Sequence, residues 1–240
     1  MKKLWIVICS LMVVMGLSQA ALATTSSVLS DYGFNVDGTK YWNDFGGGFT
    51  PSLPSSVNTS SFDLSTGLGT VTATINGVGN HYFLALFNHD LGSDYTSQSG
   101  LTSGTAATVP VQSWQIGDAD NGNGAIYTNF KANTLSDTID NNPYDPANSV
   151  IGIDLAMAMG WNFTLLADQS AYLTFSVSDL DPPSFQLIQT NPDPVESLYF
   201  SSDLRIGETG PSTVPEPSTI VLFGSAIAGL GIYMRRRRDT

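Results

Sequence analysis

The stretch Leu-Ala-Met-Ala-Met-Gly-Trp-Asn-Phe-Thr-Leu, residues 155–165, decides the fold class. Large apolar residues stand at every second position, separated by small or polar ones: Leu155, Met157, Met159, Trp161, Phe163 and Leu165. A helix would scatter these side chains around its circumference, whereas a strand places all of them on one face. The stretch therefore predicts a β-strand with one face in the core. Gly160 predicts a bend or bulge within it.

Shorter alternating runs lie on both sides of this strand, as at residues 71–75 and 173–177. Clusters of Asp, Asn, Gly and Pro separate the runs and predict turns. Many short strands joined by turns predict an all-β body, an antiparallel β-sandwich or jelly-roll-like ectodomain, over residues 67–208. Residues 24–66 are richer in Ser, Gly and Asn, so we expect loops there with one or two weak strands. Within the body, helix is expected only near residues 127–132.

Composition also favours a turn-rich body. Of the 240 residues, 42% are hydrophobic and 12% are charged, the latter about half the usual share. Only three basic residues, Lys40, Lys131 and Arg205, lie outside the two termini, against almost all of the 21 acids. So acidic a body repels phosphate backbones, which argues against a nucleic-acid partner. Divalent cations and glycans remain as partners, and the alternative is that the acids only keep the protein soluble.

Residues 1–23 have the pattern of a secretory signal peptide, which is helical until it is removed. Lys2 and Lys3 precede an apolar run that ends in Ala21-Leu22-Ala23. The small residues Ala21 and Ala23 predict cleavage by signal peptidase before Thr24, after export by the general secretion machinery. Cleavage after Ala20 and a retained N-terminal anchor are the alternatives. Because the single cysteine, Cys9, lies in this segment, the mature chain has no thiol.

The C-terminus begins with a linker at residues 209–213, followed by a segment at 214–238. This segment opens with Val214, Pro215, Glu216, Pro217 and Ser218. We expect a single transmembrane helix over residues 219–234, which would rise about 24 Å against a hydrocarbon core of roughly 30 Å. The cluster Arg235, Arg236, Arg237 and Arg238 then fixes the topology by the positive-inside rule. So short and glycine-rich a span predicts a temporary anchor.

These C-terminal residues resemble the PEP-CTERM sorting signal of Gram-negative bacteria that make exopolysaccharide. The likeness rests on the Val214-Pro-Glu-Pro-Ser218 motif, the short apolar helix, the arginine cluster and the matching signal peptide. The resemblance implies that an exosortase recognises the tag and processes it near Glu216. It also implies an intermediate anchored in the inner membrane with its body in the periplasm, then delivery to the cell surface or extracellular matrix. An ordinary tail anchor is the alternative.

The body resembles a recurrent ectodomain of PEP-CTERM proteins, one with no assigned activity. The likeness extends from about residue 79 to residue 206, through His81-Tyr82-Phe83, Ser113-Trp114-Gln115-Ile116 and Met157-Ala158-Met159-Gly160-Trp161. The resemblance supports a single β-rich exported domain and implies no chemistry.

Asp118 and Asp120 form the strongest candidate metal site, because clustered oxygens on a Gly-rich turn suit Ca²⁺. The loop is not an EF-hand, since it has Gly122 at the fifth position, which needs Asp or Asn, and Asn129 at the twelfth, which needs an acid. A solvated hairpin turn is the alternative, and no other cofactor is expected.

Candidate catalytic groups lack the motifs that would support them. His89 lies between Asn88 and Asp90, a base beside a carboxylate, yet no nucleophile motif accompanies it. We expect His89 to be a hydrogen-bonded residue at a strand end. Acidic loops offer carboxylates for glycoside hydrolysis at Asp179, Asp181, Asp193 and Glu196. Trp42 and Trp114 are candidates for stacking on sugars, whereas Trp161 is expected in the core.

Together these observations predict an exported, exosortase-sorted protein of the cell surface or exopolysaccharide matrix that has no catalysis of its own. Its partners would be signal peptidase, exosortase, the inner membrane and extracellular polysaccharide. A glycan-binding β-sandwich module is the first alternative, and a secreted hydrolase that uses loop carboxylates is the second.

Overall fold

The structure is a computed structural model that describes residues 27–44, 51–92, 98–119, 124–140, 154–192 and 195–208. These residues form one short helix, α2 (Ala125–Ala132), and twelve strands. The strands are β1 (Ser27–Val36), β2 (Thr39–Asp44), β3 (Val57–Asp63), β4 (Leu68–Asn76), β5 (Gly79–Leu91), β6 (Ser99–Ser103), β7 (Val111–Asp118), β8 (Thr138–Ile139), β9 (Leu155–Leu165), β10 (Gln169–Ser178), β11 (Gln186–Pro192) and β12 (Val195–Glu208).

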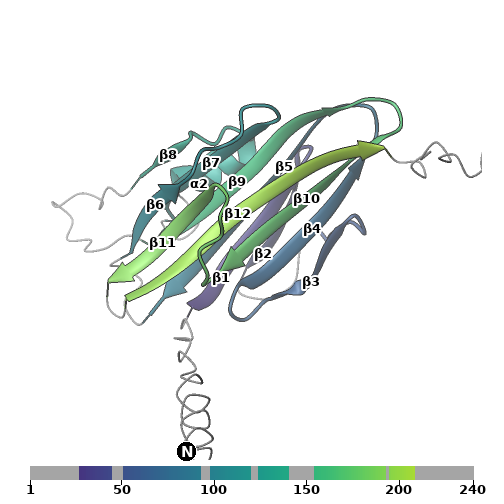
Figure 1. Cartoon of the computed structure of the whole chain (residues 1–240). Helices are drawn as coiled ribbons and strands as arrows, with labels where there is room; N and C mark the ends of the chain where they lie inside the picture. The colour runs from purple at the N-terminus through teal and green to yellow at the C-terminus, as the bar shows by residue number, and fades with distance from the viewer. Residues whose placement is uncertain are drawn as a thin grey trace, which may run out of the picture.

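The strands form two six-stranded sheets that lie one behind the other in Figure 1. Sheet A has the order β2-β1-β5-β9-β7-β8, and sheet B has the order β3-β4-β10-β12-β11-β6. All pairings are antiparallel except the short one between β7 and β8. Aromatic rings join the facing surfaces, with centroids 5.2 Å apart for Phe83 and Phe175 and 5.1 Å apart for Phe87 and Phe200. The all-β prediction is confirmed for the described residues, and jelly-roll-like connectivity stays a prediction.

Strand β9 lies where the alternating stretch predicts it. Its six large residues all belong to the core between the sheets, and Trp161 is among them. The bend or bulge expected at Gly160 is wrong, because β9 pairs with β5 and β7 without a shift of register. A Cβ at Gly160 would lie 2.5 Å from the Leu84 Cγ and 2.9 Å from the Phe83 carbonyl oxygen. Gly160 is therefore a site of close approach between β9 and β5 rather than a break in β9.

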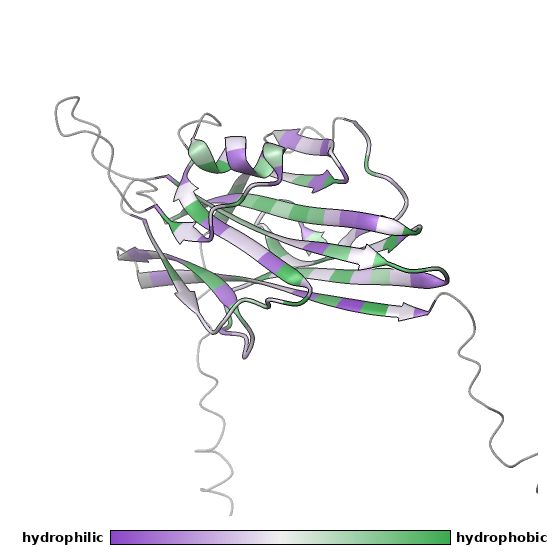
Figure 2. Ribbon diagram, turned by 90° about the horizontal axis from the view of Figure 1, so that it is seen from above, coloured by the Kyte–Doolittle hydropathy of each residue, from purple (hydrophilic) through white to green (hydrophobic). Residues whose placement is uncertain are grey.

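The other face of sheet A is also buried, because α2 covers it, as Figure 2 shows. Ile126, Tyr127 and Phe130 of the helix pack with Leu84 and Leu86 and with the small residues of β9. The helix ends at Asn133, a left-handed residue whose N–H reaches the last carbonyl groups. The helix expected near residues 127–132 is thus present as α2, and it closes a second, smaller core.

The N-terminal part of the body is more ordered than its composition predicts. Residues 24–66 were expected to hold one or two weak strands, and this is wrong, because β1, β2 and β3 all lie there. Strand β1 is internal to sheet A, and its Tyr32 and Phe34 are buried in the main core. Gly33 separates these rings and leaves room for the Trp42 side chain, whose Cε3 would lie 2.2 Å from a Cβ at that position.

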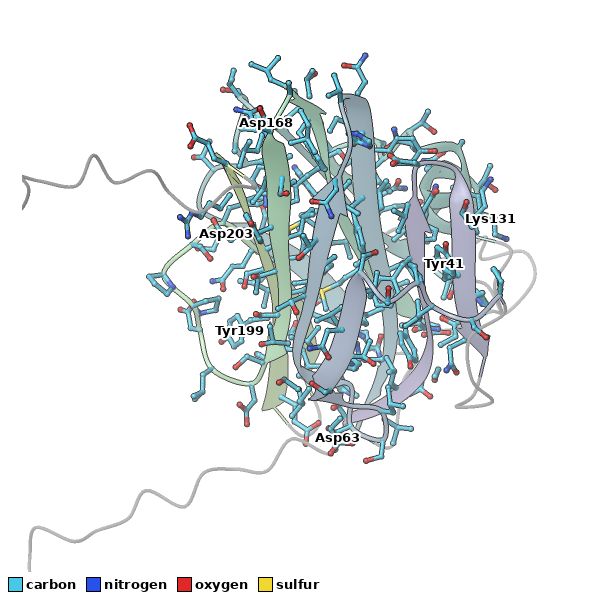
Figure 3. All side chains as sticks on the ribbon, turned by 90° about the vertical axis from the view of Figure 1, so that its right-hand side faces the viewer. Tyr41, Asp63, Lys131, Asp168, Tyr199 and Asp203 are labelled. Carbon is cyan, nitrogen blue, oxygen red and sulfur yellow. The ribbon has the colours of Figure 1, made fainter. Side chains whose placement is uncertain are left out.

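The two ends of the body carry the two termini of the described chain. At what we call the C-terminal end, the turns at 37–38, 77–78 and 166–168 lie together, and β12 finishes at Glu208, opposite Gln169. At the N-terminal end, β1 begins at Ser27. Figure 3 shows Asp168 at the first end and Asp63 at the other. No helix in the described residues is long and apolar enough to cross a membrane, and the predicted signal and transmembrane helices lie outside them.

Candidate functional site: an acidic cluster in sheet A

Four aspartates gather at the N-terminal end of sheet A because neighbouring strands place them there. Asp31 of β1 pairs with Asn88 of β5, and Asp90 follows two residues later. Asp118 ends β7 opposite Leu155, and Asp154 immediately precedes that residue. The negative charges of Asp90, Asp118 and Asp31 all act on Asp154. We call these four residues the acidic cluster.

Asp154 is the group that the cluster perturbs most. Burial raises its pKa to about 6, and the charges of Asp90, Asp118 and Asp31 act in the same direction. The Asn88 side-chain amide opposes this rise, since its Nδ2 donates to Asp154 Oδ2 over 3.5 Å. The other oxygen, Oδ1, is buried and accepts no hydrogen bond from a described residue. Asp154 can therefore take up a proton in mildly acidic solution.

Asp31 serves to hold the helix. The Tyr127 hydroxyl donates to both of its oxygens, over 2.8 Å and 3.0 Å, and so ties α2 to β1. Burial, then the Asp31 charge, raises the pKa of Tyr127, which keeps this donor protonated. Asp90 is also engaged, because the Ser30 hydroxyl donates to its Oδ2 over 2.5 Å.

The predicted calcium ligands are only partly placed. Asp118 lies in the acidic cluster, whereas Asp120 lies outside the described residues. Asn88 Oδ1 is buried near Asp154 without a hydrogen-bond partner, as a cation ligand would be. Within the described ranges, however, no group of three or more His, Cys, Asp or Glu side chains is placed to hold a metal ion. Calcium binding by Asp118 and Asp120 stays a prediction.

The two histidines lie apart and both are engaged in the fold. His89 is fully buried between the sheets, and its Nε2 lies 3.1 Å from the Gly67 carbonyl oxygen of the neighbouring sheet. Burial lowers its pKa to about 4, against the effect of that hydrogen bond, so His89 is neutral at pH 7. The interpretation of His89 as a hydrogen-bonded residue of the strand end is confirmed. The adjacent acid Asp90 instead bonds Ser30.

Two buried glutamines join the sheets near His89, and sequence reasoning missed them. Gln98 Nε2 donates to the His89 carbonyl oxygen over 3.1 Å, while its Oε1 accepts the Leu155 N–H over 3.0 Å. Gln189 of β11 donates to the same His89 oxygen over 2.7 Å and to Gln98 Oε1 over 2.7 Å. The Gln98 amide thus continues the hydrogen bonding where β5 and β9 separate. No spacing in the sequence relates these residues.

The two tryptophans proposed for sugar stacking lie far apart. Trp42 is half-buried on the outer face of sheet A, with its ring 5.3 Å from that of Tyr127 and 5.8 Å from that of Phe130. Trp114 is half-buried against the main core, 5.9 Å from the Phe185 ring. Strands β1, β5 and β9 separate β2 from β7. The two rings therefore cannot form one platform.

The loop carboxylates and the targeting residues are placed only in part. Asp181 accepts a hydrogen bond from Gln186 Nε2 over 2.5 Å, and Asp193 lies outside the described residues. The same is true of Ala21 and Ala23 and of residues 209–240, which include the sorting motif, the proposed span and the arginine cluster.

Comparison with known proteins identifies the C-terminal segment. No curated protein and no solved structure matches the chain. The sorting motif that does match indicates an exported protein that an exosortase targets, through a membrane-anchored intermediate. Residues 213–238 are a PEP-CTERM protein-sorting motif, as their resemblance predicts.

Proposed function

We propose that this chain acts without catalysis of its own at the cell surface or in the exopolysaccharide matrix, after an exosortase has sorted it there. The observation that carries the proposal is the PEP-CTERM motif at residues 213–238. In this proposal Val214, Pro215, Glu216, Pro217 and Ser218 are recognised, residues 219–234 hold the intermediate in the inner membrane, and the arginine cluster fixes its orientation. Signal peptidase removes residues 1–23 first.

The roles of the titratable side chains support a non-catalytic body. His89 is buried and neutral, and His81 bridges two turns through Asp37 Oδ2 at 2.8 Å and the Gly77 carbonyl oxygen at 3.1 Å. Asp31 anchors α2 through Tyr127. These groups stabilise the fold.

Cell fractionation tests the proposed route. Full-length protein and a variant lacking residues 214–240 are produced in the native host, and the body is followed by an antibody in periplasm, membrane, surface and medium. We expect the truncated body to accumulate in the periplasm, whereas Arg205→Ala, which alters the body alone, should be delivered normally. Unchanged surface delivery of the truncated protein would refute the proposal.

The structure restricts which residues could serve the two alternative functions. A glycan-binding module would have to use Trp42 or Trp114 singly, because strands β1, β5 and β9 separate the two rings. A hydrolase would need two carboxyl groups about 5–10 Å apart, one of them protonated, and Asp154 is the described carboxyl whose pKa suits that role. Retention on extracted exopolysaccharide, lost on Trp42→Ala or Trp114→Ala, would favour the first. Loss of sugar release on Asp154→Asn would favour the second.

A further inference from the structure

The C-terminal end of the body carries two exposed aliphatic side chains on adjacent turns. Val78 is 71% exposed and Leu166 is 64% exposed. The turn at 77–78 crosses from sheet B to sheet A, and the turn at 166–168 crosses back. The two crossings lie side by side, because Gly79 pairs with Leu165 and Asn76 pairs with Ser170. Val78 and Leu166 therefore project from the same end of the sandwich.

Hydrogen bonds hold these turns in shape. Gly77 and Gly79, with φ of +112° and +130°, allow the sharp arch that carries Val78 between them. The His81 ring joins this arch to the neighbouring turn through Gly77 and Asp37. Gln169 closes the other turn, since its Oε1 accepts the Leu166 N–H over 2.9 Å. The two aliphatic side chains thus stand on a preformed surface.

Charge is distributed unevenly between the two ends. The N-terminal end carries eight acids of the described residues: the four of the acidic cluster, Asp63, Asp179, Asp181 and Glu196. All three cations of the described body lie in the other half, since Lys40 pairs with Asn35, Arg205 pairs with Tyr172, and the Lys131 carbonyl accepts from Asn35 Nδ2. Figure 3 shows Lys131 in the half of the body that holds Asp168. The C-terminal half also carries four acids, Asp37, Asp168, Asp203 and Glu208. Its three cations offset most of their charge, so this half is far less acidic than the N-terminal end.

The sorting segment starts near this end. Only residues 209–218 separate Glu208 from the proposed span, and a chain of that length reaches at most about 40 Å. Strand β12, with 14 residues, spans about 45 Å of the body. The tether therefore keeps the C-terminal end at the bilayer and cannot let the body stand on its N-terminal end. Exposed aliphatic side chains at that other end, Leu64 and Leu180, also adjoin acids, namely Asp63, Asp179 and Asp181.

We propose that Val78 and Leu166 contact the phospholipid surface of the inner membrane while the protein is anchored, so that the acidic N-terminal end points away from it. This inference rests on the proposed membrane-anchored route. The less acidic end, which carries the two aliphatic side chains, meets the lipid interface. The more acidic end is directed away from anionic headgroups, which would repel it. The long axis of the body would thereby lie along the membrane normal, with the C-terminal end and the sorting motif next to the membrane.

Site-directed fluorescence quenching tests this orientation. The chain with Cys9→Ser is produced in cells without exosortase, purified from membranes, checked for its N-terminus by mass spectrometry, and placed in phosphatidylethanolamine/phosphatidylglycerol liposomes. A fluorophore is attached at Val78→Cys or, as the matched control, at Leu180→Cys, a site that is 62% exposed. Lipids with a nitroxide on the acyl chain should quench the label at residue 78 and leave the label at residue 180 bright.

A second pair of variants separates contact from mere tethering. Leu166→Asp places a charge beside the label at residue 78 and should abolish its quenching, whereas Leu64→Asp should leave it unchanged. Equal quenching at residues 78 and 180, or quenching at 78 that survives Leu166→Asp, would overturn the proposed contact. Failure of the unlabelled chain to float with liposomes would instead overturn the anchored route on which the proposal rests.

Discussion

Replacing Asp154 with Asn removes a carboxylate whose charge destabilises the folded body. The pKa of Asp154 rises from its ordinary value of 3.8 to about 6 on folding, and each pKa unit corresponds to about 1.4 kcal/mol. Asp154→Asn should therefore raise the free energy of unfolding by about 2–3 kcal/mol at pH 8. For a body of this size, the melting temperature should rise by about 4–12 °C. The variant keeps an oxygen that can accept the hydrogen bond from Asn88.

The stabilisation by Asp154→Asn should depend on pH. Because the folded-state pKa lies above the unfolded value, the contribution of Asp154 to stability is fully present below pH 3.8 and is lost as pH rises through about 6. The advantage of the variant should thus be complete above pH 7 and vanish near pH 4. Circular dichroism melts of the exported body at pH 4, 6 and 8 measure it.

A control with the opposite sign is available in Asp63. Hydrogen bonds from Ser65, then Thr66, lower the pKa of this exposed carboxyl, so Asp63→Asn should not stabilise the protein at any pH. If Asp154→Asn lowered the melting temperature at pH 8, or changed it equally at pH 4 and pH 8, the burial and like-charge argument for the acidic cluster would be wrong.

Three further substitutions test the interior. Gly160→Ala should lower the free energy of unfolding, measured by urea titration, by about 1–3 kcal/mol, because the added Cβ overlaps Leu84 and the Phe83 carbonyl group. The control Gly207→Ala should be neutral, because the nearest atom to its added Cβ is 3.7 Å away. Equal effects of the two substitutions would contradict the close approach of β9 and β5 at Gly160. Because folding lowers the pKa of His89, the wild-type protein should lose stability as pH falls from 6.5 to about 4. His89→Gln should reduce this loss, measured as the change of melting temperature with pH. The same change of melting temperature with pH in both proteins would exclude His89 as the cause of the loss. Trp42→Ala should cost about 2 kcal/mol by removing packing on Tyr127 and Phe130, and an unchanged urea midpoint would mean that the ring is free for another role.

Local patterns predicted the strand class well. In β9 the large residues lie on the face that packs against sheet B, and the small residues lie on the face that α2 covers. The same pattern is harder to see in β1, although Tyr32 and Phe34 are buried, because a shift of register between Leu29 and Asp31 changes which positions face the core. Gly160 shows the limit of single-residue rules. Whether a glycine in a strand marks a bulge or a close contact depends on its neighbour across the sheet.

The acidic cluster could not be predicted, since strand pairing alone assembles it. Asp118 was singled out because it opens a turn rich in Asp, Asn and Gly, and it does lie in the cluster. No sequence pattern predicts a role for Asp154, because it only precedes an alternating run. Its burial depends on the elements packed around it. Sorting, by contrast, depends on a short contiguous motif, which is why residues 213–238 could be identified from their sequence.

The intact mass of the protein recovered from the cell surface or medium tests the central claim most directly. The sorting account predicts a chain that begins at Thr24 and has lost the residues after the Pro215-Glu216-Pro217 region, including the four arginines. A surface form that still ends at Thr240, with Arg235, Arg236, Arg237 and Arg238 intact, would contradict processing by an exosortase.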